Sequence, residues 1–358
     1  TFPAGLPVAA TGPGARLLAM TAMADFHPLV RDWFTDRYGE PTAIQELAWP
    51  RIAGGEHLLI TAPTGSGKTL TAFLWALNRF ITGDLATGST RVLYISPLKA
   101  LNNDIRRNLL TPLEELRALF EARGLPFPAV SVATRSGDTD QEMRRRMLRH
   151  PPEILITTPE SLNLLLSSRG GQGLLYDIDT LVLDEIHSVV DSKRGVYLMA
   201  GVERLVPMSG EFQRIALSAT INPMREVARF SGGYRRAEMG FEPREVTLLE
   251  APAEKEYQIA IRYPEEAAAR GEDEKVWDYL AGDLLARVNE NQSTLIFVNS
   301  RALCEKLTFK INNAAGRLVA YAHHGSLSRE IRADVEAKLK GGELEAIVAT
   351  SSLEMGID

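Results

Sequence analysis

The chain has 358 residues, of which 45% are hydrophobic and 24% charged, as in a globular protein long enough for two domains. Its net charge of −6 argues against a generally basic protein that coats nucleic acid, but leaves room for a local groove that grips phosphates. There is no apolar run of the roughly 20 residues that a membrane span needs. There is also no signal-peptide pattern at the start, and the single cysteine, Cys304, excludes an internal disulfide, so a cytoplasmic protein without a membrane partner is expected.

Residues 1–24 are interpreted as an N-terminal arm, and a first structured unit is expected over residues 25–235. The apolar residues of Asp25–Phe34 recur with helical spacing, which predicts a helix there. Gln45 lies about 20 residues before a glycine-rich loop. Because a glutamine amide both donates and accepts hydrogen bonds, Gln45 either reads the edge of an adenine or lies solvated on a helix surface.

A phosphate-binding loop is predicted where the apolar run Leu58–Ile60 meets Thr64-Gly65-Ser66-Gly67-Lys68-Thr69 and a second apolar run follows. The glycines let backbone amides converge on one anion, and the start of the next helix adds partial positive charge. Lys68 is expected to reach the terminal phosphates of ATP, and the Thr69 hydroxyl to ligate Mg²⁺. Ala62 stands where the strict pattern has its first glycine. The alternative is a plain glycine turn before a helix.

Short apolar runs alternate with helical segments along the rest of this unit, which predicts an α/β fold with a doubly wound parallel sheet. The expected strands are Arg91–Ser96, Val130–Thr134, Ile154–Thr157, Leu181–Leu183 and Arg214–Leu217. A polar segment follows each of them. Ligands of such sheets gather at the carboxyl ends of the strands, so these polar segments are expected to form one site.

Two carboxylates, Asp184 and Glu185, follow the expected strand Leu181–Leu183 directly. At the tip of a buried strand close to a phosphate loop, Asp184 suits the coordination sphere of Mg²⁺. Glu185 is suited to orient and deprotonate the attacking water in phosphoryl transfer. The alternative is an ordinary acidic turn.

Three further residues are candidates for coupling the nucleotide to movement: His187 beside the acidic pair, and Ser218 and Thr220 at the end of the last strand. His187 could also be a metal ligand or a proton carrier, but without a neighbouring cysteine a coupling role is preferred over zinc. The basic run Arg144-Arg145-Arg146 is either a solvated helix face or a nucleic-acid contact. His323 and His324 are adjacent, and adjacent residues rarely bind one metal ion.

The regular alternation weakens after about residue 231, and residues 236–272 are interpreted as a connector between domains. A second α/β unit is expected over residues 273–358, with strands Thr294–Val298, Leu318–Ala322 and Ala346–Ala349. Two or three strands are too few for a complete sheet of this kind, so the second domain is expected to be incomplete.

Taken in order, these motifs resemble those of superfamily 2 helicases and, within them, of the large helicase-related (Lhr) group. The resemblance is carried by Gln45, APTGSGKT at 62–69, SPLKALNNDI at 96–105, RSGD at 135–138, TTPESL at 157–162, DEIH at 184–187, SATI at 218–221, IFVNSR at 296–301, HHGSLSRE at 323–330 and ATSSLEMGID at 349–358. The phosphate-loop and acidic motifs occur in many NTPases, whereas SPLKALNNDI and ATSSLEMGID are far more specific.

The resemblance implies two tandem RecA-like domains, the second incomplete, and ATP-driven movement along single-stranded DNA, 3′ to 5′, with unwinding of DNA or DNA–RNA duplexes. It places Gly356 and Asp358 against the nucleotide. It implies that the strand is lined by Ser96, Pro97, Lys99, Thr158, Pro159, Glu160, Ser161, Ser300, Arg301 and Thr350. The family's next motif, whose arginines reach the γ-phosphate, has no counterpart before Asp358, so this stretch alone is expected to turn over slowly.

Two hypotheses therefore remain from the sequence. The first is a motor enzyme that hydrolyses ATP and moves on nucleic acid. The second is an ATP-gated clamp that binds nucleic acid with little turnover. Strand displacement, together with phosphate release stimulated by nucleic acid, distinguishes the motor enzyme from the clamp. No motif indicates a protein partner.

Overall fold

The computed structural model describes residues 22–63, 65–97, 99–219, 221–251, 259–261 and 276–350. The chain divides into two compact units, Thr1–Glu254 and Lys255–Asp358. None of the helices in these described ranges combines the length and the apolar character that a bilayer crossing needs.

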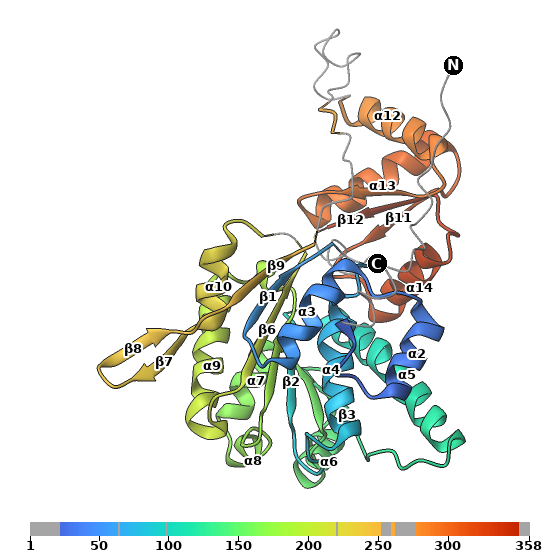
Figure 1. Cartoon of the computed structure of the whole chain (residues 1–358). Helices are drawn as coiled ribbons and strands as arrows, with labels where there is room; N and C mark the ends of the chain where they lie inside the picture. Colours follow the sequence, from blue (N-terminus) through green and yellow to red (C-terminus); the bar gives the residue numbers. More distant parts are fainter. Residues whose placement is uncertain are drawn as a thin grey trace, which may run out of the picture. The chain divides into compact units, whose positions relative to one another are not determined.

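The first unit is built on a seven-stranded sheet of order β3-β4-β2-β5-β6-β1-β9, in which all the neighbouring strands are parallel (Figure 1). Its strands are β1 (Leu58–Thr61), β2 (Val92–Ile95), β3 (Val132–Arg135), β4 (Ile154–Thr157), β5 (Thr180–Leu183), β6 (Gln213–Ser218) and β9 (Thr247–Glu250). β1 lies between β6 and β9: the chain runs from β1 through β2 to β3 at one edge, then returns through β4, β5 and β6 to β9 at the other, as expected of a doubly wound sheet.

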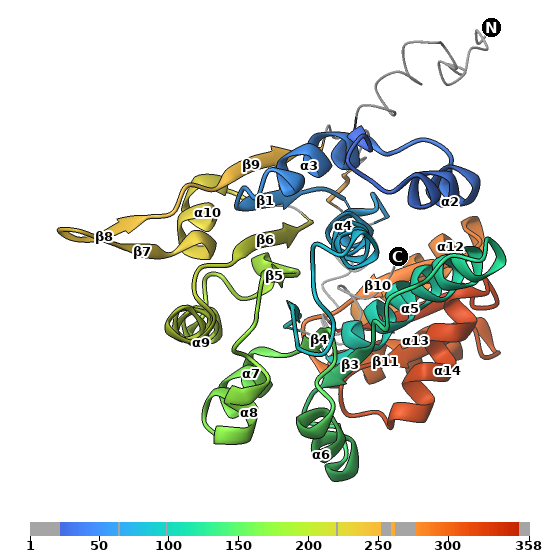
Figure 2. The same cartoon turned by 60° about the horizontal axis from the view of Figure 1, so that its bottom comes forward.

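Helices cover both faces of this sheet (Figure 2). They are α2 (Pro28–Tyr38), α3 (Ala43–Ala53), α4 (Lys68–Thr82), α5 (Lys99–Ala122), α6 (Gln141–Arg149), α7 (Pro159–Leu166), α8 (Arg169–Gly173), the short η1 (Ile186–Ser188), α9 (Lys193–Ser209) and α10 (Met224–Gly232). Successive residues of one strand enter opposite cores: Leu58 and Ile60 pack with α2–α5, whereas Leu59 packs with α7–α10. This alternation explains why the strands are apolar along their whole length.

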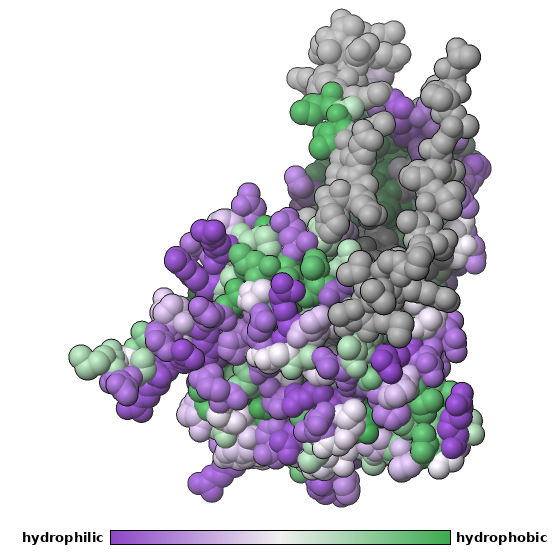
Figure 3. Space-filling model, viewed as in Figure 1, coloured by the Kyte–Doolittle hydropathy of each residue, from purple (hydrophilic) through white to green (hydrophobic). Residues whose placement is uncertain are grey.

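A hairpin of β7 (Tyr234–Ala237) and β8 (Gly240–Pro243) projects from the first unit. Its tip is apolar and exposed (Figure 3), with Met239 98% and Phe241 76% accessible. The chain beyond it is anchored by Arg244, whose buried guanidinium pairs with Glu211 and Glu203.

The connector expected over residues 236–272 therefore begins too early. β8 and β9 belong to the first unit, and β9 pairs with β1 along Leu58–Thr61. β9 is an edge strand on which only Leu249 is buried, so its apolar signal is weaker than that of the strands covered on both faces.

The second unit has a three-stranded parallel sheet of order β10-β12-β11, made of β10 (Thr294–Phe297), β11 (Ala320–His323) and β12 (Ala346–Ala349). Its helices are α12 (Val276–Glu290), α13 (Arg301–Ala315) and α14 (Arg329–Lys340). Cys304 of α13 is fully buried in the core between this helix and the sheet, as expected for a structural residue.

Candidate nucleotide site and nucleic-acid surface

The loop after β1 has the conformation that a phosphate loop requires. Gly65 and Gly67 adopt positive φ angles of 78° and 82°, which favour glycine, and Gly67 caps the start of α4. Ala62 has no positive φ and is buried, so the loop does not need a glycine at that position. The Ser66 hydroxyl is buried with no hydrogen-bond partner among the described residues. A buried donor left in this way fits a loop that receives an anion. Thr64 lies outside the described residues.

Gln45 lies under this loop and not on a solvated helix face, since only 3% of it is exposed. Its Oε1 accepts a hydrogen bond of 2.9 Å from the Thr42 N–H, and the Thr42 hydroxyl donates to the Ser66 carbonyl at 2.9 Å. A Cβ atom added at Gly67 would come within 2.6 Å of the Gln45 Nε2. The start of α3 is thus locked to the loop, and the Gln45 amide is held beside it.

The acidic pair is buried next to Lys68. The Lys68 Nζ lies 3.6 Å from the Glu185 Oε1, and both side chains are less than a tenth exposed. Glu185 has a φ of 47°, the only positive value at a non-glycine residue in the described ranges. Such a backbone conformation is unfavourable for a residue with a side chain and is often kept where it aims a functional group.

Asp184 is fixed at both carboxylate oxygens. Its Oδ1 accepts a 2.9 Å hydrogen bond from the Glu185 N–H, and its Oδ2 accepts a very short one from the Tyr94 hydroxyl. Burial, reinforced by the charge of Glu185, raises the pKa of Asp184 from 3.8 to about 7, although Tyr94 and Lys68 act in the opposite direction. Burial and the Asp184 charge raise the pKa of Tyr94 well above 10, so its phenol remains a donor.

A polar chain runs from the acidic pair to the neighbouring strand. The His187 Nδ1 lies 3.3 Å from the Glu185 Oε2 and 3.0 Å from the Ser218 Oγ. Glu185 and His187 follow β5, whereas Ser218 ends β6, so the contacts join the ends of two adjacent strands. The described residues include no cluster of three or more histidine, cysteine or acidic side chains that could bind a metal. Thr220 lies outside the described residues, as do Gly356 and Asp358.

Most of the first-unit residues expected to line a nucleic-acid strand have buried side chains. The side chains of Ser96, Pro97, Thr158 and Ser161 are buried, and the Thr158 hydroxyl caps α7 by accepting from the Ser161 N–H. Pro159 is the first residue of α7 and is buried too. Glu160 is exposed and pairs with Arg194 through two hydrogen bonds of 2.6 and 3.0 Å. Lys99 starts α5, but its side chain is not described.

In the second unit, three of the residues expected to contact the nucleic-acid strand lie just after β10 or β12, and two of these form the start of α13. Ser300 caps α13 by accepting from the Leu303 N–H at 3.2 Å. The exposed Arg301 donates from Nη1 to the Ser326 hydroxyl at 2.6 Å. Thr350 follows β12, and its N–H donates to the His323 carbonyl. The buried His324 Nε2 pairs with the Glu305 carboxylate at 2.7 Å.

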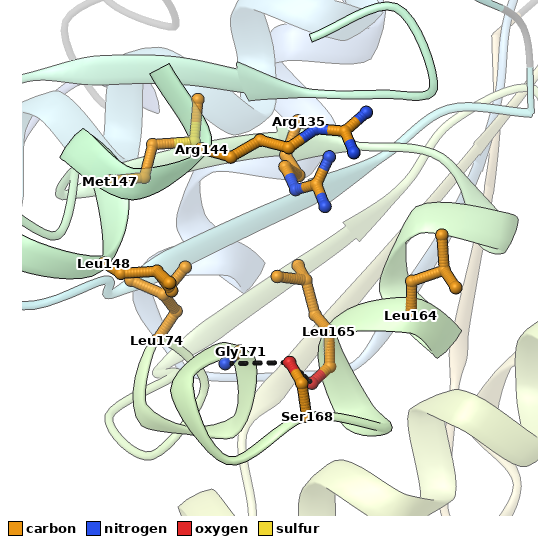
Figure 4. A pocket seen from close by; sticks show the side chains of 9 residues that line it. All are labelled: Arg135, Arg144, Met147, Leu148, Leu164, Leu165, Ser168, Gly171 and Leu174. Carbon is orange, nitrogen blue, oxygen red and sulfur yellow. Dashed lines mark hydrogen bonds between the residues drawn. The ribbon is translucent and has the colours of Figure 1, made fainter. Parts of the chain in front are cut away.

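Sequence reasoning left Arg144 in a basic run with two alternatives and did not foresee its pairing with Arg135 over a cavity of about 70 Å³ (Figure 4). Arg135 ends β3 and Arg144 belongs to α6, and their guanidinium groups lie side by side above a floor of leucines. They donate only to the Ser136 and Gly137 carbonyls and have no carboxylate partner within the described ranges. Burial, with the charge of Arg144, lowers the pKa of Arg135. Among the three arginines of this run, Arg144 is therefore distinguished from the exposed Arg145 and Arg146.

Comparison with known proteins gives two family matches. A model described as DEAD/DEAH box helicase matches residues 42–230, and one described as helicase conserved C-terminal domain matches residues 275–358. The chain is 40% identical, over 93% of its length, to an Lhr helicase/probable uracil glycosylase of Mycolicibacterium smegmatis. It is 41% identical, again over 93%, to an ATP-dependent helicase Lhr-Core of Methanothermobacter thermautotrophicus.

The structure agrees with these matches. The solved structure of Mycobacterium smegmatis helicase Lhr bound to ssDNA and AMP-PNP superposes with a TM-score of 0.80 at 42% identity, covering 94% of this chain and 43% of that one. The tandem RecA-like fold and the resemblance to the Lhr group are thereby confirmed. The chain spans 24% of the length of the first of the curated relatives and 39% of the second.

Proposed function

Because this chain belongs to the DEAD/DEAH box helicase family, we propose that it binds and hydrolyses ATP and couples hydrolysis to 3′-to-5′ movement along single-stranded DNA, unwinding DNA or DNA–RNA duplexes. The observation that carries the proposal is the polar chain of Lys68, Glu185, His187 and Ser218. It joins a phosphate-binding lysine to a carboxylate suited to activate water, and continues to the end of the next strand. A clamp that only binds ATP would not need the last two links.

The residues present fit ATP with magnesium. Thr69 and Asp184 offer a hydroxyl and a carboxylate, which are hard oxygen ligands that suit Mg²⁺. Asp184 accepts from Tyr94, whose ring stacks on Phe73, one turn after Thr69 in α4. Bound there, the ion would neutralise charge on the phosphates. Lys68 binds the terminal phosphates, Glu185 holds and deprotonates the attacking water, and His187 passes the state of Glu185 to Ser218. Gln45 holds the adenine edge with the amide that lies beside the loop.

The burial of Thr158 and Ser161 refines the proposed nucleic-acid contact. Their hydroxyls are used within α7, and the Ser161 N–H is held by Thr158, so the proposed phosphate contacts in this region do not run through these two side chains. Arg135 and Arg144, at the same end of the sheet, supply positive charge without a carboxylate of their own. Contacts of this kind read the backbone and not the bases, as continuous movement requires.

The test is a comparison of phosphate release and strand displacement with and without single-stranded DNA. Release that rises at least tenfold with DNA, together with displacement of a duplex carrying a 3′ single-stranded tail, supports the motor. A matched duplex with a 5′ tail is the polarity control. ATP binding that strengthens DNA binding without release or displacement would favour the clamp instead.

A further inference from the structure

Tyr94 lies on β2 in the interior of the first unit, and none of its side chain is exposed. Its ring stacks on Phe73 of α4, with ring centroids 4.7 Å apart and planes 17° from parallel. This stacking, in a fully buried position, fixes the direction of the ring and therefore the position of its hydroxyl. A phenylalanine would fill this core equally well, so packing alone does not account for the hydroxyl.

The Tyr94 hydroxyl contacts one of the groups that would hold magnesium: it donates to the Oδ2 of Asp184. The Oδ1 of Asp184 is already held by the Glu185 N–H at 2.9 Å. One phenol and one backbone amide thus hold both oxygens of the carboxylate at the end of β5.

We propose that Tyr94 is a positioning residue for the magnesium–nucleotide site: its hydroxyl sets the orientation of the Asp184 carboxylate before the metal arrives. The inference rests on the proposed function, since it assumes that the site takes ATP with Mg²⁺. Groups that orient metal ligands in this way typically change metal affinity or activity by about 10–100-fold when removed.

The experiment uses Tyr94→Phe, which keeps the ring and its stacking on Phe73 and removes only the hydroxyl. Binding of a fluorescent, non-hydrolysable ATP analogue is measured at increasing Mg²⁺ concentration. The Mg²⁺ concentration at half-saturation should rise about tenfold, while affinity for the analogue in EDTA stays within about twofold. Phe73→Leu is the matched control, because it removes the stack but keeps the hydroxyl. It should lower the melting temperature, while it should shift the half-saturating Mg²⁺ concentration less than Tyr94→Phe does.

Non-additivity provides an independent check. Because Tyr94 acts through Asp184, adding Tyr94→Phe to Asp184→Asn should change half-saturation by less than about twofold beyond Asp184→Asn alone. A full additional tenfold change in the double variant would contradict the proposal.

Two other results would also overturn it. If Tyr94→Phe melts at a lower temperature or fails to fold, with an unchanged magnesium response in whatever folds, the role is structural. If the wild-type chain binds no analogue at any Mg²⁺ concentration, the proposed function fails as well, and this inference fails with it. Normal wild-type binding with an unshifted Tyr94→Phe response rejects only the role of Tyr94.

Discussion

The ammonium group of Lys68 and the carboxylate of Glu185 face each other across 3.6 Å in a site from which water is almost excluded. Each is the partner of the other in the absence of nucleotide, although their proposed tasks differ. When ATP binds, the Lys68 ammonium would pair with the phosphates in place of Glu185. The Glu185 carboxylate would then be free to act on water. The ion pair holds Lys68 against one Glu185 oxygen, while His187 contacts the other at 3.3 Å.

Substitution should separate the two tasks. Lys68→Ala should weaken ATP binding beyond detection, because the lysine contacts phosphate in the ground state, while Glu185→Gln should bind ATP within about threefold of wild type and lose hydrolysis by at least 100-fold. Equilibrium binding of a fluorescent analogue and phosphate release measure the two effects. Glu160→Gln, on an exposed carboxylate paired with Arg194, is the control for loss of a negative charge. Equal losses of affinity in both variants would contradict the assigned roles.

Gln45 should determine the preference for adenine. Gln45→Glu keeps the acceptor that holds the Thr42 N–H but loses the amide donor, so ATP affinity should fall about tenfold, as expected for one lost hydrogen bond, and the preference over GTP should shrink. Competition by GTP against a bound ATP analogue measures it. Glu46→Gln alters the next residue of α3 and should change neither value. A Gln45→Glu protein that still discriminates fully against GTP would show that the amide only supports the loop.

Single-stranded DNA should bind mainly through phosphates, despite the net charge of −6. The affinity should fall as salt rises and vary little between random sequences of one length. Arg144→Gln should weaken binding and lower the slope of log affinity against log salt by about 1, whereas Arg146→Gln, on an exposed part of the same helix, should change the slope little. Fluorescence anisotropy across a salt series measures both. Strong preference for one sequence, with a flat salt response, would rule out a backbone contact.

The stability of the nucleotide-free protein should depend on pH through Asp184. Because the pKa of this carboxyl is raised from 3.8 to about 7, the folded state binds the proton more tightly than the unfolded chain. Its contribution to stability is therefore complete below about pH 4 and is lost as pH rises through about 7. The melting temperature of wild type should fall relative to that of Asp184→Asn between about pH 5 and pH 8. Parallel curves for the two proteins would show that Asp184 does not titrate in this range.

The strands and the phosphate loop could be predicted from sequence because their signals are local. Leu58–Ile60 is apolar on both faces of a covered strand, and the glycines at 65 and 67 stand where the backbone adopts positive φ. Helix starts have weaker local signals: the helix expected from Asp25 begins at Pro28, because His27 caps it and proline suits the first turn.

The contacts that define the site could not be predicted in this way, because they join residues distant in sequence. Tyr94 and Asp184 are 90 residues apart, and nothing near Tyr94 distinguishes it from an ordinary core aromatic. For Gln45 the sequence left two alternatives, and only its contacts with Thr42 and the loop remove the solvated one. Likewise, burial separates Arg144 from its two neighbours in a run of identical residues.

The edge strand β9 gives the first unit an unusual mechanical property. The Ala251 N–H, directly after β9, donates to the Thr61 carbonyl at 2.8 Å, at the point where β1 gives way to the phosphate loop. A pull on the chain beyond Ala251 therefore acts as shear along four register pairs between β9 and β1, from Leu58–Thr247 to Thr61–Glu250. Shear loads several hydrogen bonds at once. Tension in the chain beyond Ala251 is therefore borne by β1, the strand that leads into the phosphate loop.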